Sequence, residues 1–273
     1  IWQKDLLSPS DYNHNIRGIG EDCYYLSCEG PLRKVLKTNI YSGDTACVYE
    51  SNVKESGMLF TGSLGLISHN NKELLVLFEY GNQDPSTDET DKYLVVIDRD
   101  TFEIITREWV GCQSFAIDIK VRTHEDKILF RMGETLYCFD TSNNTFIWKH
   151  TIDSFVMEDI IIYGNSVYRI DTDKFYGINI NTGAVFCRAK YGDIDNILPS
   201  WAVVDSDYVY LFYASNSIRV YKAQTGKLVG ELSPENMSTK FGVNFALTDN
   251  KYLYITTYND IRCYPKFSSD KWD

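Results

Sequence analysis

The sequence lacks the short motifs on which most catalytic, nucleotide and metal sites are built. None of the patterns HExxH, GxSxG, GxxxxGK and GxGxxG occurs in its 273 residues, and only four histidines are present. Neither a nucleophile with its base nor a set of metal ligands can be recognised. We therefore predict no catalytic, cofactor-binding or metal-binding residue, and no enzymatic activity.

Long apolar runs and paired cysteines are also missing. No stretch approaches the roughly 20 residues of a membrane-spanning helix, and no signal peptide is visible in the sequence. The seven cysteines form no CxxC pair. Cys138, Cys187 and Cys263 stand among apolar strand residues, so we expect free, buried thiols in a reducing compartment. This predicts a cytoplasmic protein without a membrane span; a periplasmic location is the alternative if a signal peptide was removed.

Positive charge is in deficit. The chain has 27 Lys and Arg against 38 Asp and Glu, which gives a formal net charge of −11. Such a surface repels nucleic-acid phosphates and attracts basic partners. We therefore exclude nucleic acid and expect a basic protein as the partner.

What the sequence does contain is a repeat. One turn position recurs at intervals of 59, 42, 39 and 43 residues, at Gly43, Phe102, Asn144, Gly183 and Gly226. Glycine and asparagine suit a turn with positive φ. Each turn follows an apolar β-type segment, and six such segments occur, beginning near residues 22, 73, 126, 165, 207 and 251. Each unit thus reads as four strands, with the turn between the third and the fourth.

A four-stranded unit with a period near 40 residues is typical of a β-propeller. We predict an all-β fold, with residues 1–273 as a single β-propeller of four-stranded antiparallel blades. Six blades are expected, and seven remain possible if the long first interval hides a further strand set. The segment IWQKDL at residues 1–6 resembles IWKHTI at 147–152, so we expect the N-terminal strand to complete the last blade and close the ring.

The long first interval contains an acidic insertion. Residues 82–91 read NQDPSTDETD and hold Asp84, Asp88, Glu89 and Asp91 without an apolar residue. The segment lacks the spacing and the glycine of an EF-hand loop, so calcium binding is not expected. It reads either as a solvated loop or as a surface for a basic partner, and we take its four carboxylates as the candidate partner-binding residues.

The repeated hairpins carry a resemblance to a known family. INTGAVF at 180–186 and AQTGKLV at 223–229 resemble the repeats of quinoprotein-type (PQQ-like) β-propellers, as do the units around residues 102 and 144. The outer-strand tryptophan of those repeats falls on Trp148, with Trp2 a second match, whereas Cys187 and Gly230 occupy it elsewhere. The resemblance implies the propeller fold, with Tyr and Phe replacing most docking tryptophans. The adjacent cysteine pair and the cofactor site of the quinoprotein dehydrogenases are absent.

A rigid acidic propeller without catalytic motifs favours protein recognition. Our specific hypothesis is an immunity or inhibitor protein that neutralises a basic toxin domain, such as a nuclease. One alternative is a scaffold subunit similar to the quinoprotein-like propeller of outer-membrane barrel assembly. Another is a glycosidase-like or small-molecule-binding propeller that uses paired carboxylates in its central channel.

Overall fold

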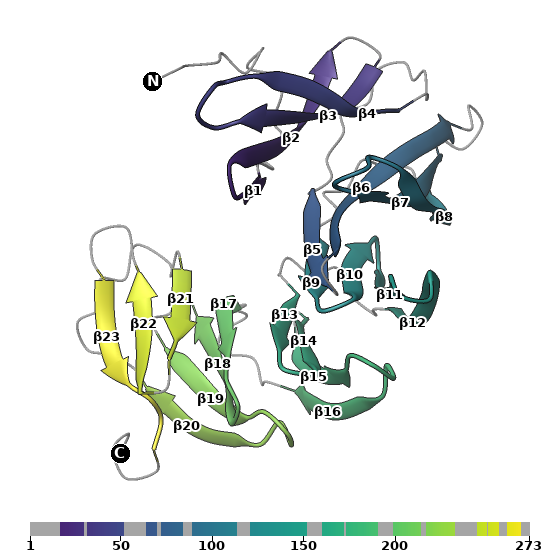
Figure 1. Cartoon of the computed structure of the whole chain (residues 1–273). Coiled ribbons are helices and arrows are strands. Elements are labelled where there is room, and N and C mark those ends of the chain that lie inside the picture. The colour runs from purple at the N-terminus through teal and green to yellow at the C-terminus, as the bar shows by residue number, and fades with distance from the viewer. Residues whose placement is uncertain are drawn as a thin grey trace. The chain divides into compact units, whose positions relative to one another are not determined.

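The computed structural model describes residues 17–29, 32–51, 64–69, 72–83, 89–113, 121–151, 160–171, 173–190, 199–213, 217–232, 245–249, 251–256 and 261–268. Every regular element in these residues is a β-strand, and the strand pairs are antiparallel. The chain divides into two compact units, Ile1–Lys149 and His150–Asp273, which are described in turn (Figure 1).

The first unit holds three sheets, in each of which every strand pairs with the next one along the chain. Sheet 1 comprises β1 (Arg17–Ile19), β2 (Asp22–Glu29), β3 (Leu32–Asn39) and β4 (Thr45–Ser51). Sheet 2 comprises β5 (Gly65–His69), β6 (Lys72–Gln83), β7 (Thr90–Asp98) and β8 (Ile104–Gln113). Sheet 3 comprises β9 (Val121–His124), β10 (Lys127–Met132), β11 (Thr135–Asp140) and β12 (Thr145–Thr151), and β12 crosses the boundary between the units.

The second unit repeats the same order of strands. Sheet 4 comprises β13 (Ile161–Tyr163), β14 (Ser166–Ile170), β15 (Lys174–Asn179) and β16 (Val185–Lys190). Sheet 5 comprises β17 (Pro199–Val204), β18 (Tyr208–Tyr213), β19 (Ile218–Lys222) and β20 (Leu228–Leu232). Sheet 6 has three strands among the described residues, β21 (Phe245–Thr248), β22 (Tyr252–Thr256) and β23 (Ile261–Pro265).

The predicted turn positions are confirmed. All five lie between the third and the fourth strand of a sheet and have positive φ: Gly43 (77°), Phe102 (61°), Asn144 (52°), Gly183 (70°) and Gly226 (69°). Four of these turns open with an Asn or Asp whose side-chain oxygen accepts backbone N–H groups two and three residues later, at Asn39, Asp98, Asp140 and Asn179. The same local hydrogen bonds therefore build the hairpin in successive sheets.

The core lies between consecutive sheets of each unit, because the middle strands are apolar on both faces. On β6, the side chains from Leu74 to Phe78 are at most 6% exposed. Phe78 packs on Phe130 of sheet 3 with ring centroids 4.7 Å apart, and Phe175 of sheet 4 packs on Tyr221 of sheet 5 at 5.4 Å. Sheet-to-sheet packing of aromatic and branched side chains thus holds neighbouring sheets together.

The outer strand of one sheet also contacts the hairpin turn of the next. Within the second unit, which begins at His150, His150 Nε2 lies 2.6 Å from the carbonyl oxygen of Gly183. Gly226 lies against Cys187 and Ala189 on β16, so closely that no Cβ would fit there. Gly230 on β20 lies equally close to the ring of Phe267. At these three junctions the side chains that contact the neighbouring segment are histidine, cysteine and phenylalanine rather than tryptophan.

Two expectations from the sequence need correction. β6 reaches Gln83 and β7 begins at Thr90, which pairs with Gln83, so both ends of the predicted loop 82–91 belong to strands. A register shift after Tyr80 lets the pairing continue through polar residues, because backbone hydrogen bonds do not require apolar side chains.

The second correction concerns a cysteine. Cys138 and Cys187 are buried as expected, but Cys263 is exposed because it lies on the outward-facing side of β23. Residues 1–6 lie outside the described residues, so closure of the ring, the single-domain organisation and the number of blades stay predictions.

Candidate functional site

Of the four predicted partner-binding carboxylates, the two that the structure describes, Glu89 and Asp91, lie in different environments. Asp84 and Asp88 lie outside the described residues. Glu89 is exposed immediately before β7. Asp91 is half-buried within β7, where its Oδ1 accepts hydrogen bonds from Trp109 Nε1 at 2.8 Å and from Cys112 Sγ at 3.1 Å.

These two hydrogen bonds determine the direction in which the pKa of Asp91 is shifted. Both favour the ionised carboxylate, and the indole N–H has the larger effect, so the pKa of Asp91 is lowered. The same carboxylate raises the pKa of the Cys112 thiol. Asp91 therefore holds the tips of two β8 side chains in place while it remains charged.

A second polar cluster lies beside it, between sheets 1 and 2. Glu79 on β6 is only 4% exposed. Its carboxylate accepts hydrogen bonds from Tyr49 Oη on β4 at 3.0 Å and from Arg107 Nε on β8 at 2.5 Å. The Arg107 guanidinium also lies 3.7 Å from the centre of the Tyr93 ring. Arg107 is thus held in one position although 41% of its side chain is exposed.

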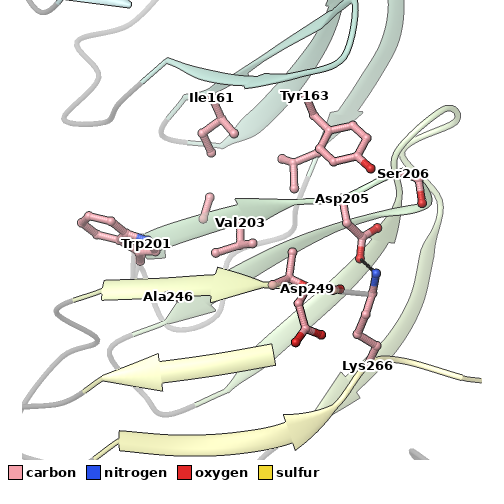
Figure 2. A pocket seen from close by; sticks show the side chains of 12 residues that line it. Ile161, Tyr163, Trp201, Val203, Asp205, Ser206, Ala246, Asp249 and Lys266 are labelled. Atoms are coloured by element: carbon pink, nitrogen blue, oxygen red, sulfur yellow. Dashed lines mark hydrogen bonds and ion pairs between the residues drawn. The ribbon is translucent and has the colours of Figure 1, made fainter. Parts of the chain in front are cut away.

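The second unit contains a pocket of about 430 Å³ along the first strands of its three sheets. Figure 2 shows Ile161 and Tyr163 of β13 on one side, Trp201 and Val203 of β17 in the middle, and Ala246 and Asp249 from the β21 side opposite. The pocket therefore combines an apolar wall with a polar end.

At the polar end, both carboxylate oxygens of Asp205 are engaged in contacts within the protein. Oδ1 accepts the backbone N–H groups of Asp207 and Tyr208, at 2.9 and 2.8 Å, and so shapes the turn between β17 and β18. Oδ2 pairs with Lys266 Nζ at 2.7 Å, an ion pair that Figure 2 shows across the end of the pocket. This pair ties the segment after β23 to sheet 5.

Asp249 is used in the same way. Its Oδ1 accepts the backbone N–H of Lys251 at 2.6 Å, and its Oδ2 accepts the Tyr254 hydroxyl at 2.9 Å. The backbone N–H groups of its turn, that of Lys251 first, lower the pKa of Asp249. A glycosidase requires a carboxylic acid whose pKa is raised so that it can donate a proton. With Asp205 ion-paired and the pKa of Asp249 lowered, the pocket gives no support to the glycosidase hypothesis.

Within the described ranges, no three His, Cys, Asp or Glu side chains gather in a way that could hold a metal ion. Nor does that part of the chain contain a helix long and apolar enough to cross a membrane.

Comparison with known proteins decides the family. A family model described as "Outer membrane protein assembly factor BamB" matches residues 97–264, more than half of the chain. The chain belongs to this family. The resemblance of its hairpins to PQQ-like propeller repeats is therefore confirmed. A comparison with curated protein sequences gives no match.

Solved structures show the BamB-like fold independently. The chain is similar to BamB from Moraxella catarrhalis, with a TM-score of 0.58 and 13% identity, over 91% of this chain and 70% of that one. It is also similar to Kluyveromyces lactis Hsv2, with a TM-score of 0.56 and 11% identity, over 91% of this chain and 72% of that one. Identities this low show the fold alone, and they confirm the predicted β-propeller of four-stranded antiparallel sheets.

Sequence reasoning missed Trp109, Arg107 and the pocket. Trp109 is 55% exposed, and it lies beside Asp91 because β7 pairs with β8. The composition of residues 82–91 drew attention to the carboxylates. An Arg and a Trp spaced two residues apart on the next strand were the available signal, since alternate residues of a strand share a face.

Proposed function

We propose that this chain is a non-enzymatic β-propeller scaffold whose function is to bind another protein. The observation that carries the proposal is the match of residues 97–264 to a family described as an outer membrane protein assembly factor. An assembly factor acts through contacts with other proteins. The described part of the chain shows carboxylates used in turns and ion pairs, which fits a binding role better than a catalytic one.

The packing of the sheets supports this role. In the second unit His150 contacts the Gly183 turn and the Gly226 turn lies against β16, and in the first unit Glu79 joins sheets 1 and 2 by hydrogen bonds. Surface side chains on such a framework keep their positions before a partner arrives. A preorganised surface loses less conformational entropy on binding.

The charge supports a basic partner. A net charge of −11 speeds the approach of a positively charged protein and disfavours acidic competitors. This charge also favours a second candidate function, an immunity or inhibitor protein that neutralises a basic toxin domain such as a nuclease. The inhibitor would act in the cytoplasm, whereas a scaffold of the assembly-factor type would act in the periplasm, and both locations stay proposals.

Affinity capture tests the proposed function. The purified chain is immobilised, incubated with lysate and membrane extract of its native cells, and washed at low and at high salt. Recovery of outer-membrane assembly proteins supports the scaffold, and recovery of one basic toxin-like protein that is lost at high salt supports the inhibitor. Failure to recover any protein above the level of an unrelated acidic protein of similar size contradicts protein binding.

A further inference from the structure

The outer strand of sheet 2 differs from the other outer strands. β8 has ten residues, against seven in β4 and β12, six in β16 and five in β20. It lies at the end of its sheet, and among the described residues no strand pairs with its free edge. A long free edge with apolar side chains invites pairing with another chain.

Three side chains of β8 form a row on one side of sheet 2. Trp109, Arg107 and Ile104 lie opposite Tyr93, Val95 and Ile97 of β7, which all share one face of that strand. Trp109 is 55% exposed and Ile104 is 49% exposed. Trp and Arg are the residue types that contribute most to protein interfaces. We call Ile104, Arg107 and Trp109 the β8 row.

Two members of the β8 row are fixed before any partner binds. The hydrogen bond to Asp91 holds the Trp109 indole, and Glu79 with the Tyr93 ring holds the Arg107 guanidinium. An exposed side chain in water ordinarily samples several rotamers and loses that freedom on binding. In the β8 row most of this ordering is already complete, which is the property of an interface anchor.

The surroundings of the β8 row are acidic. Glu103 is exposed next to Ile104 at the start of the row, Glu89 is exposed near Cys112, and Asp91 remains ionised. The charge of Arg107 is already paired with Glu79. A partner that covers the row therefore meets net negative charge around an apolar centre.

On the basis of the protein-binding function proposed above, we infer that the β8 row is the docking site for an extended, basic segment of a partner protein. Apolar side chains of the segment contact Trp109 and Ile104, and its Lys or Arg side chains face the surrounding carboxylates. Since a strand rises about 3.4 Å per residue, a segment of about six residues covers the row. Between the register shifts that flank residues 106–109, its backbone can pair with the free edge of β8.

Selection of peptides on the intact chain tests this inference. A phage-displayed library of linear peptides of about twelve residues is selected on the wild-type chain, and the recovered peptides are measured by fluorescence anisotropy. We expect basic peptides with apolar residues. The Trp109→Ala variant should bind them at least about tenfold more weakly, because a buried Trp is a typical interface hot spot. Glu103→Lys, which reverses a charge next to Ile104, should weaken binding less, and mainly at low salt.

The matched control is Leu228→Ala on β20, which also removes an exposed side chain, 46% exposed, from an outer strand. It should leave the affinities within about twofold of wild type. Circular dichroism of both variants verifies that the sheets are retained. Peptides that are acidic, or that bind Trp109→Ala as tightly as wild type, overturn the docking site. Repeating the affinity capture with Trp109→Ala separates the two proposals. A partner captured equally well by the variant overturns only the docking site, whereas the absence of any partner overturns protein binding itself.

Discussion

Gly226 is the position at which the contact between consecutive sheets is most open to test. Its φ is +69°, and a Cβ at this position would overlap the Cβ of Ala189 and lie 3.0 Å from the Cys187 sulfur. A left-handed conformation costs an L residue about 1–2 kcal/mol, and overpacking a tight contact costs about 1–3 kcal/mol. We therefore expect Gly226→Ala to lower the free energy of unfolding by about 2–5 kcal/mol.

Gly164 provides the matched control. It lies in the turn between β13 and β14 with φ +52°, and no atom lies within 4 Å of the position its Cβ would take. Gly164→Ala should therefore lose only the conformational part, about 1–2 kcal/mol. The gain from a less flexible unfolded chain is the same in both variants and cancels.

Urea denaturation followed by circular dichroism measures the difference. If the free energy of unfolding falls by about 3 kcal/mol per molar urea, Gly226→Ala should lower the urea concentration at the midpoint of unfolding by about 1 M relative to wild type. Gly164→Ala should move it by less than about half as much. Equal shifts in the two variants would mean that the Gly226 turn does not pack against β16, and the account of how the sheets are joined would be wrong.

Three further substitutions test the polar clusters. Glu79→Ala removes the carboxylate that holds the partly exposed Arg107 and should lower the free energy of unfolding by about 2–3 kcal/mol in urea; a loss below about 0.5 kcal/mol contradicts the network. The pKa of Asp98 is lowered by a backbone N–H of its own turn, so its stabilisation is present above about pH 4 and is lost as the pH falls through the lower folded pKa. Asp98→Asn keeps the acceptor, so its unfolding free energy should fall less than that of wild type between pH 6 and pH 2.5, and an unchanged acid dependence refutes this. Asp91→Asn replaces the carboxylate, whose hydrogen bond and charge raise the pKa of Cys112, by a neutral and weaker acceptor. Iodoacetamide should then label Cys112 faster at pH 8, and an unchanged rate contradicts the contact.

Phe102 is a position at which the repeat pattern correctly predicted the backbone conformation. Alignment of the repeats placed it where the other units have Gly or Asn, and it has the positive φ of that position. An aromatic residue disfavours this conformation. Phe102 nevertheless packs against the core between sheets 1 and 2, and the hydrogen bonds of the Asp98 side chain close the turn. The periodic position therefore predicted the backbone better than the identity of the residue did.

The acidic segment shows where a local pattern fails. Its composition predicted a loop whose four carboxylates have the same role. Asp91, however, belongs to β7 and accepts a hydrogen bond from Trp109. Which strand residues face a given carboxylate depends on the register of β7 against β8 and on its two shifts. A register is a property of two strands together, so the composition of one segment does not contain it.

The sequence by itself determined the all-β class, the four-stranded unit and the turn positions, because strand alternation and turn chemistry act between residues close together in the chain. Only the tertiary structure decided which side chains meet. Glu79 joins Tyr49 to Arg107, Trp109 is fixed on Asp91, and Lys266 reaches Asp205 because pairing and packing bring distant segments into contact. Candidate surfaces such as the β8 row depend on those long-range contacts, which local patterns in the chain do not encode.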